Sequence, residues 1–391
     1  MKILFLHEVG YLEKPIFEMH EFPELLSAMG HEVAFADFPE KRISNSYAIE
    51  GAVIQGRVLP TTKLRLYSQK SMLPGILGRL AAALIFPIFF GRVLRHFQPD
   101  LVVSFAVPTS GWQAAFICRF TGTPFVFRAL DVSHRIRKTL FAPLVKIAER
   151  VVYRLANWVS CNNPAMMTYC LSLGANQKAS SVDYPPLDLS HFLHAEFTTE
   201  IREKHEIPGD SQVILYMGSF FYFSGLQDVI RELSAMKAKP HLVLIGGGEQ
   251  DAELRELTKS LKLEQFVTFT GFIDFRDLPS YLAIADLAIN PMVPSLVSHK
   301  ALPNKVLQYM AAALPVVTTQ LEGLFSVFPN SDGIRQVSDS TSVLAAAVEM
   351  LRNPKLRELG ESNRAQVASQ FDKDTTARKF EQRLLAVWRD K

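Results

Sequence analysis

The sequence predicts an α/β protein made of two domains, each built around a parallel sheet. Three observations lead to this prediction. At 391 residues the chain is longer than one hydrophobic core usually supports. Apolar segments of strand length alternate with segments of helical period in both halves. Between the halves, residues 181–212 are polar and contain prolines, as expected of a linker.

The first half begins with a strand, a helix and a second strand, and the alternation then continues. We expect strands at 2–9, 31–38, 100–107 and 124–130, with a strand end at 159–163, and helices at 17–30, 111–122 and 139–156.

The second half repeats this alternation after the linker. We expect strands at 213–220, 241–248, 267–273 and 286–292, and helices at 226–236, 249–263, 277–285 and 371–390. Strands that alternate with helices form parallel sheets, whose ligands bind at the carboxyl ends of the strands. We therefore predict two Rossmann-like domains facing a cleft, at residues 1–190 and 191–370, and a C-terminal helix at 371–391.

The segment PNKVLQYMAAALPVV (303–317) changes from a loop to a helix and then to a buried strand. Pro303 suits a helix start, Asn304 can cap the helix, and the free N–H groups of the first turn can bind an anion together with Lys305. Gln308 lies three residues after Lys305, on the same helix face. The alternative is an ordinary amphipathic helix between two strands.

Two other segments contain candidate site residues. Gly218 follows a strand, in a place where the backbone can closely approach a ligand, although a structural turn is the alternative. Asp131 and His134 follow another strand, where they could act as a catalytic base or anchor an acceptor, or lie in a solvated surface turn. We find no Walker A, H-E-x-x-H or Ser-His-Asp pattern, so no motif supports an NTPase or a hydrolase function.

The cysteines and the N-terminus predict a cytoplasmic protein. Cys118, Cys161 and Cys170 are odd in number and lack metal-ligand spacing, which is typical of free thiols in a reducing compartment. Glu8 interrupts the first apolar run, so residues 1–11 resemble a first strand and not a signal peptide.

A basic region in the first half predicts contact with an anionic membrane surface. Residues 57–154 contain 15 lysines and arginines against three acidic residues. Within them, the segment 72–97 has an apolar core of about eleven residues, which we expect to be too short to span a bilayer but able to lie in its interface. A buried helix is the alternative. Because no nucleic-acid motif is visible, we expect no nucleic-acid partner.

Taken together, the chain resembles the retaining glycosyltransferases of the GT-B fold, specifically glycosyltransferase family 4. The resemblance covers essentially the whole chain, and it rests on segments that follow one another in that family's order: YMGSFFYFSGLQDVI, LVLIGGGEQDAELREL, VTFTGFIDFRDLPSYLAIADLAINP and NKVLQYMAAALPVVTTQLEGL. It implies that the second domain binds a nucleotide sugar, that the first binds the acceptor, and that the C-terminal helix crosses back to the first domain.

The resemblance also implies roles for individual residues. In the second domain, the backbone at Asn304 and Lys305 would hold the diphosphate, and Gln308, where the family usually has Glu, would bind the ribose. The remaining donor-site positions are Gly218 and Ser219, then Phe272 and Ile273, which would lie near the nucleobase, and Lys300, which would lie near the donor sugar. Ser219 and Ser224 stand where the family often has cations. In the first domain, the residues expected to face the reaction centre are His7, Glu8, Gly10, Arg128, Asp131 and His134.

The function implied is transfer of a sugar, with retention, from a nucleotide donor that we expect to be UDP-linked. We expect no metal and no cofactor besides this substrate, and a lipid-linked or cell-surface glycan as acceptor, as in polysaccharide biosynthesis. We place the protein in the cytoplasm, peripheral at the inner face of the cell membrane. Two alternatives stay open: a GT-B sugar-nucleotide epimerase, and a degenerate, non-catalytic GT-B subunit, because Lys300 and Gln308 replace the usual glutamates.

Overall fold

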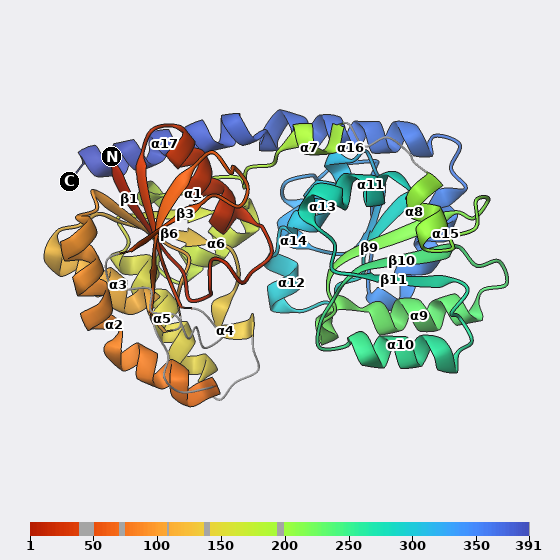
Figure 1. The fold of residues 1–391 in the computed structure, drawn as a ribbon, viewed down its shortest axis with the longest axis horizontal. Coiled ribbons are helices and arrows are strands. Elements are labelled where there is room, and N and C mark those ends of the chain that lie inside the picture. Colours follow the sequence, from red (N-terminus) through yellow and green to blue (C-terminus); the bar gives the residue numbers. More distant parts are fainter. Residues whose placement is uncertain (39–50, 70–74, 108, 137–140, 194–198, 391) are drawn as a thin grey trace. The chain divides into compact units, whose positions relative to one another are not determined.

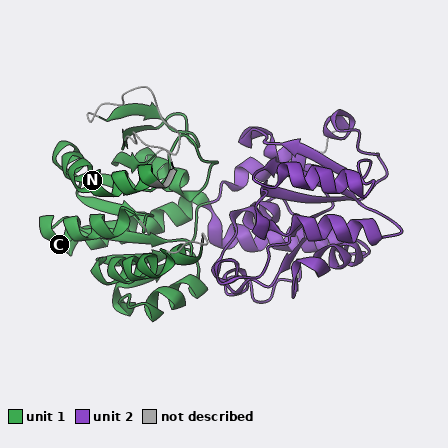
Figure 2. Ribbon diagram, turned by 90° about the horizontal axis from the view of Figure 1, so that it is seen from below, with its two compact units in different colours: residues 1–186, 373–391 green, residues 187–372 purple. Residues whose placement is uncertain are grey.

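The computed structural model describes residues 1–38, 51–69, 75–107, 109–136, 141–193 and 199–390. They divide into two compact units (Figures 1 and 2): unit 1 contains residues 1–186 and 373–391, and unit 2 contains residues 187–372. The domain boundaries expected from the sequence, after residues 190 and 370, lie within a few residues of these divisions. Some residues of the predicted basic region, namely Lys70, Arg137 and Lys138, lie outside the described residues.

Unit 1 is built on a sheet that, in the described residues, has eight strands in the order β3-β4-β2-β1-β5-β6-β7-β8. Its pairs are parallel except for β3 with β4. The strands are β1 (Lys2–Leu6), β2 (Glu32–Asp37), β3 (Ala52–Gln55), β4 (Lys63–Ser68), β5 (Leu101–Ser104), β6 (Phe125–Ala129), β7 (Trp158–Cys161) and β8 (Ser180–Val182). The central strands β1, β5 and β6 are apolar and almost wholly buried, as expected of strands covered on both faces.

The last helix of the chain belongs to unit 1. The helices of this unit are α1 (Glu18–Ala28), α2 (Gly75–Phe97), α3 (Gly111–Thr121), α4 (Ser133–Ile136), α5 (Ala142–Leu155), α6 (Pro164–Ser172) and α17 (Lys373–Arg389). On α17, Phe380 packs against Phe22 of α1 with ring centroids 4.3 Å apart, and Glu381 lies 2.7 Å from His31. The expected return of the C-terminal helix to the first domain is confirmed.

Helix α2 occupies most of the predicted segment 72–97 and extends beyond its apolar core. It continues through Pro87, whose missing N–H leaves the carbonyl of Ala83 without its helical donor. The Gln113 side chain of α3 donates to that carbonyl at 3.0 Å and so satisfies it. Residues 77–97 are long and apolar enough to cross a membrane by length and composition, a test that the core helix of a soluble protein also passes. The expectation that this segment is too short to span a bilayer is therefore corrected.

Unit 2 is built on a parallel sheet that, in the described residues, has six strands in the order β11-β10-β9-β12-β13-β14. The strands are β9 (Val213–Ser219), β10 (His241–Gly247), β11 (Val267–Gly271), β12 (Leu287–Asn290), β13 (Val316–Thr319) and β14 (Ile334–Val337). The helices are α7 (Leu189–Leu193), α8 (Thr199–Lys204), α9 (Leu226–Ala235), α10 (Asp251–Ser260), α11 (Leu278–Ala283), α12 (Leu296–Lys300), α13 (Asn304–Ala311), α14 (Glu322–Phe325), α15 (Val343–Leu351) and α16 (Leu356–Phe371). The predicted fold class, two Rossmann-like parallel-sheet domains, is confirmed.

Candidate functional site

The amino end of helix α13 has no side-chain cap. Pro303 occupies the N-cap position and no side chain caps the helix, so Asn304 does not play the capping role that we expected of it. The N–H groups at the start of an α-helix have no partner within the helix, and the helix dipole favours an anion there. The first turn of α13 therefore presents main-chain donors, and Lys305 adds a positive charge.

Two side chains of α13, four residues apart, form hydrogen bonds with the carboxyl end of β9. The hydroxyl of Tyr309 accepts a hydrogen bond from the N–H of Met217 at 2.6 Å. Lys305 donates to the hydroxyl of Tyr216 at 2.9 Å, and its Nζ lies 4.2 Å from the centre of that ring. Burial lowers the pKa of Lys305 to about 7. An anion bound here would stabilise the ammonium form.

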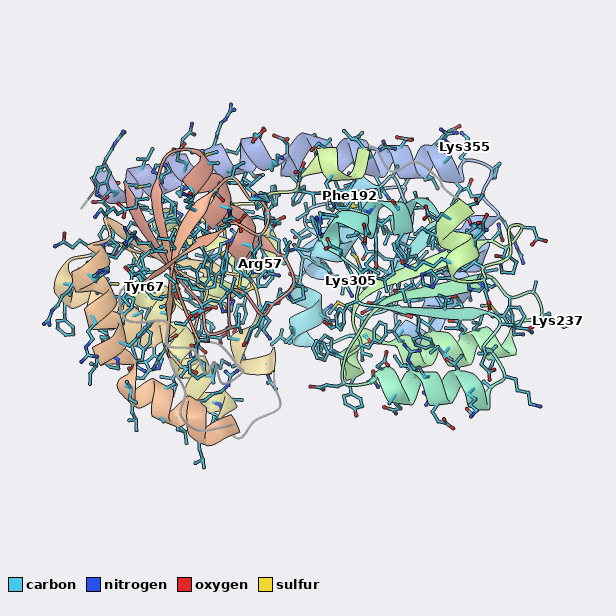
Figure 3. All side chains as sticks on the ribbon, in the orientation of Figure 1. Arg57, Tyr67, Phe192, Lys237, Lys305 and Lys355 are labelled. Carbon is cyan, nitrogen blue, oxygen red and sulfur yellow. The ribbon has the colours of Figure 1, made fainter. Side chains whose placement is uncertain are left out.

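Two glycines keep side chains away from this lysine. Gly218, at the end of β9, has φ of 141°, and a Cβ on it would lie 2.8 Å from the Nζ of Lys305. Gly246 of β10 has φ of 125°, and its Cβ would lie 2.1 Å from the carbonyl oxygen of Gly218. Any other residue would be strained at either position. At Gly246 it would also clash with backbone, and at Gly218 it would displace the end of the Lys305 side chain. The ends of β9 and β10 thus offer bare backbone beside Lys305, which is labelled in Figure 3.

Phe272 and Ile273 follow β11 at the same edge of the sheet. The Phe272 side chain is 73% exposed, and its ring edge lies 3.1 Å from the place where a Cβ on Gly247 would be. Ile273 is half-buried. An exposed aromatic ring beside bare backbone is a surface on which a planar group can stack.

The remaining predicted donor-site residues have identified neighbours in unit 2. Lys300, at the end of α12, donates to Glu322 of α14 at 2.6 Å. The carbonyl of Ser219 accepts a hydrogen bond from Tyr216 at 3.1 Å. Gln308 is half-buried on α13, one turn from Lys305. The structure thus places Gly218 and Lys305 in direct proximity and ties Lys300 to an acidic partner.

In unit 1, His7 and Glu8 follow the carboxyl end of β1. The Oε1 atom of Glu8 accepts hydrogen bonds from the N–H groups of Thr109 and Ser110, both at 2.6 Å. The Nδ1 atom of His7 accepts from the N–H of Glu8 at 2.8 Å, which leaves the ring proton on Nε2. Burial lowers the pKa of His7 to about 3, so the imidazole is neutral. Gly10 lies in the turn that follows, where its carbonyl accepts from the N–H of Glu13 at 3.2 Å.

Arg128 does not face an acceptor, and this expectation is corrected. Its side chain is 0% exposed. The guanidinium donates to Glu18 of α1, to Ser160 at 2.9 Å and to the carbonyl of Asp183 at 2.6 Å. Burial raises the pKa of Glu18 even though the arginine beside it acts in the opposite direction. Arg128 therefore joins α1 to β7 and to the loop after β8 as a buried ion pair.

His134 is bound to a carboxylate that we did not predict. Its Nδ1 lies 2.7 Å from Oε2 of Glu149, and the hydroxyl of Tyr169 donates to the same oxygen at 2.9 Å. Both His134 and Glu149 are buried, whereas Asp131 is exposed. No cluster of side chains that could hold a metal ion occurs among the described residues.

Two family models match this chain. The model "Glycosyl transferases group 1" matches residues 211–353, which include the site around α13, and "Glycosyl transferase 4-like domain" matches residues 19–181. The chain is a group 1 glycosyltransferase. The predicted family, family 4 with the GT-B fold, is confirmed.

Curated proteins similar to this group 1 glycosyltransferase come from several bacteria. It is 26% identical to the N-acetyl-alpha-D-glucosaminyl L-malate synthase of Bacillus anthracis, over 49% of this chain and 50% of that protein. Two proteins of Rhizobium meliloti, the lipopolysaccharide core biosynthesis glycosyltransferases LpsE and LpsD, are 24% and 25% identical, over 57% and 68% of this chain and 62% and 69% of theirs. The match thus spans about half to two thirds of the length of these relatives.

Solved structures share the fold of this group 1 glycosyltransferase. The sucrose-phosphate synthase of Thermosynechococcus elongatus has a TM-score of 0.82 at 19% identity, covering 100% of both chains. Anabaena Alr3699/HepE in complex with UDP-glucose has a TM-score of 0.74 at 17% identity, covering 99% of this chain and 100% of that one.

Sequence reasoning missed three residues of the unit 2 site in this glycosyltransferase. Tyr216, Tyr309 and Glu322 contact the lysines or the strand end that the site uses. The spacing of Lys305 and Tyr309, one helical turn apart, could have indicated that both reach the same strand. Nothing in the sequence pairs Glu322 with Lys300, because the two residues lie on different short helices.

Proposed function

We propose that this glycosyltransferase moves a hexosyl group from a UDP-sugar, with retention at the anomeric carbon, to a lipid-linked or cell-surface glycan acceptor. The observation that carries the proposal is the partly buried Lys305 beside the open amino end of α13 and the bare backbone of Gly218. When a glycosyl group leaves a nucleotide sugar, negative charge grows on the diphosphate. Oriented main-chain donors and a desolvated ammonium stabilise such charge.

The donor and acceptor classes rest on similarity as well as on the site. One structural neighbour is described in complex with UDP-glucose, which supports a UDP-linked donor. Two relatives bear the name of lipopolysaccharide core biosynthesis, which supports a glycan acceptor in polysaccharide biosynthesis. We assign the diphosphate to Asn304 and Lys305, and the ribose to Gln308. In this proposal Phe272 and Ile273 lie by the nucleobase and Lys300 lies by the donor sugar.

The acceptor residues belong to unit 1 in this proposal. We assign His7, Glu8 and Gly10 to the acceptor, since they follow the carboxyl end of β1, where ligands of parallel sheets bind. Asp131 and His134 stay proposed catalytic groups. The Glu149 carboxylate would hold the His134 ring in one orientation, through the hydrogen bond to Nδ1.

A donor assay with one matched control tests the transfer. Purified chain is mixed with a panel of nucleotide sugars and a membrane extract, and release of nucleoside diphosphate is measured. Lys305→Ala should weaken donor binding about 10- to 100-fold, since it removes a charged hydrogen bond. Lys237→Ala, an exposed lysine of the same unit, should leave it unchanged (Figure 3).

Three other outcomes would contradict the proposal. If no donor binds and none is turned over, the transferase assignment fails. Interconversion of UDP-sugars without an acceptor would favour the epimerase. Unchanged function in the cell for the Lys305→Ala variant would favour a non-catalytic subunit, an alternative in which Glu322 merely neutralises Lys300.

We also propose that unit 1 docks on the anionic inner face of the cell membrane. Large apolar side chains are exposed on α2, α3 and the α5 region: Leu77, Leu80, Leu84, Ile85, Ile88, Trp112, Phe116, Phe120, Phe141, Leu144 and Ile147. Helix α3 contacts both α2 and α5, and the three helices lie together on one side of unit 1 (Figure 1). We call this set of side chains the apolar face. Exposed apolar patches of such extent mark interaction surfaces.

The charges on these three helices favour anionic lipid over a protein partner. Within their bounds the basic residues are Arg79, Arg92, Arg95, Arg119, Lys146, Arg150 and Arg154. The acidic residue within those bounds, Glu149, is buried against His134. An apolar face with a positively charged surround and no exposed carboxylate on its helices complements an anionic bilayer surface. Such docking would bring a lipid-linked acceptor to the enzyme.

A further inference from the structure

A small pocket lies at the carboxyl edge of the unit 1 sheet. Its lining comes from the segments that follow β1, β2, β4 and β5, which are four neighbouring strands, and from one face of α2. Its empty space is about 310 Å³ when the opening to solvent is included. Most of this volume belongs to the opening, and the enclosed part has room for one small functional group. The carboxyl edge is where parallel sheets bind ligands.

Two buried carboxylates line this pocket, and each has one oxygen that accepts no hydrogen bond of standard geometry from the described residues. Glu8 is 6% exposed and Asp37 is 4% exposed. One oxygen of Glu8 is held by the start of α3, and one oxygen of Asp37 accepts from the N–H of Tyr11 at 2.7 Å. Their other oxygens, Oε2 of Glu8 and Oδ1 of Asp37, are buried and accept no hydrogen bond of standard geometry from the described residues. The hydroxyl of Ser68 lies near the Asp37 carboxyl and lowers its pKa, while burial acts more strongly in the opposite direction and raises this pKa to about 6. A buried acceptor left unpaired costs about 1–3 kcal/mol, so both oxygens indicate a missing donor.

The rest of the lining decides what kind of donor fits. Ala82, Phe86 and Phe89 share one face of α2 and form an apolar wall. Among the described lining residues there is no lysine or arginine, and His7 is neutral. No group of three or more metal-ligating side chains occurs in the described chain. The pocket is therefore negatively charged, and it lacks the number of ligands that a metal ion needs.

We propose that this pocket binds an ammonium group carried by the acceptor. Such a group supplies both the missing hydrogen-bond donors and the missing positive charge, and the carbon atoms that carry it can pack on the aromatic wall. An amino sugar and an aminoethyl head group share this chemistry. The inference rests on the proposed glycosyl transfer only in naming the bound molecule as the acceptor.

Binding of small probes to the full chain tests this directly. D-Glucosamine, N-acetyl-D-glucosamine and D-glucose differ at one position, which is an ammonium, a neutral amide or a hydroxyl. Calorimetric titration should show that glucosamine binds at least tenfold more tightly than the other two. Ethanolamine serves as the head-group probe, and a preference for it over glucosamine would identify an aminoethyl source. Equal binding of glucosamine and glucose overturns the proposal.

Variants locate the binding and separate it from the transferase activity. Glu8→Gln and Asp37→Asn keep the shape of each side chain and remove its charge, so each should abolish the preference for glucosamine. Glu32→Gln, an exposed carboxylate paired with Lys2 and Arg65 at 3.7 and 3.6 Å, is the matched control and should keep it. UDP-glucose binding, measured in parallel, reports on unit 2. If the unsubstituted chain prefers glucosamine but does not bind UDP-glucose, the transferase proposal is contradicted and the pocket proposal stands. If both pocket variants still prefer glucosamine, the pocket proposal is contradicted.

Discussion

At the scale of single residues, the buried Arg128 and the partly buried Lys305 differ in what neutralises their charge. Arg128 is paired with the carboxylate of Glu18, whereas the hydrogen-bond partner of Lys305 among the described residues is the neutral hydroxyl of Tyr216. A buried ion pair is strongly destabilised when one partner is removed, so its two charges serve the fold. A cation without an acidic partner can instead be neutralised by an anionic ligand. Arg128 is thus structural, and Lys305 is suited to a diphosphate.

The lowered pKa of Lys305 predicts how donor binding depends on pH. In the free protein, burial keeps this pKa near 7. A bound diphosphate raises it again, so above pH 7 the complex takes up a proton that the free protein lacks. The affinity for UDP-glucose should therefore be constant below pH 7 and fall by up to about tenfold per pH unit above it. Calorimetric titration from pH 6 to 9 measures this, and the Lys305→Ala variant should lose the dependence.

The ion pair of Arg128 predicts a loss of stability on its removal. Arg128→Met leaves the Glu18 carboxylate buried without its partner, and we expect the free energy of unfolding to fall by about 3–5 kcal/mol. Arg119→Met, an exposed arginine of α3, should change it by less than about 0.5 kcal/mol. Urea denaturation of both variants gives the values. Equal stability of the two would show that the pair contributes nothing.

At the scale of elements, helix α2 has two apolar faces with different surroundings. Ala82, Phe86 and Phe89 line the pocket, while Leu84 is 81% exposed and Ile88 lies on the same exposed side. Gln113 satisfies the carbonyl that Pro87 leaves free, so the helix continues past the proline without an unpaired group there. One helix can therefore form part of an acceptor pocket and part of a docking surface.

The apolar face predicts vesicle binding that depends on lipid charge. The protein should float with vesicles that contain phosphatidylglycerol and not with phosphatidylcholine alone, and binding should weaken as salt is added. Leu84→Glu with Ile88→Glu removes two side chains that would each contribute about 1.5–3 kcal/mol on burial, so we expect at least a tenfold loss. Val53→Glu, an exposed residue of β3, is the control. Equal loss in the control, or dimerisation through the apolar face, would contradict membrane docking.

At the scale of the whole chain, the C-terminal helix completes the core of the first unit. Phe380, Leu384 and Val387 of α17 belong to the same buried cluster as Phe5 of β1 and Phe22 of α1. Unit 1 is thus formed by segments from both ends of the sequence. Its stability therefore depends on residues that come after the whole of unit 2 in the sequence.

This dependence predicts the effect of a single substitution in α17. Phe380→Ala should lower the free energy of unfolding of unit 1 by about 3–5 kcal/mol, since it deletes a buried ring. Lys379→Ala, the exposed neighbour, should have little effect. Hydrogen exchange of β1 and α1 amides reports on unit 1 specifically. Unchanged exchange in the Phe380→Ala variant would show that unit 1 does not rely on α17.

The sequence by itself determined the two parallel sheets and the amino end of α13. Both follow from local patterns: buried strands read as continuous apolar runs, and Pro303 marks the start of helix α13. The short strands β3, β8 and β14 were not predicted because three or four residues at a half-exposed sheet edge carry no clear period. Strand β4, which has six residues and lies next to the edge, was not predicted either.

Only the tertiary structure decided which charged groups are free to meet a ligand. Arg128 and Glu18 are 110 residues apart, Lys300 and Glu322 lie on separate short helices, and Glu8 and Asp37 come together through the pairing of β1 with β2. Contacts between residues so distant in the chain leave no periodic trace in the sequence. The sheet order and the packing of helices on it bring these groups together. The same packing leaves Lys305 beside bare backbone, and it leaves two buried carboxylate oxygens at the unit 1 pocket without a hydrogen bond of standard geometry from the described residues.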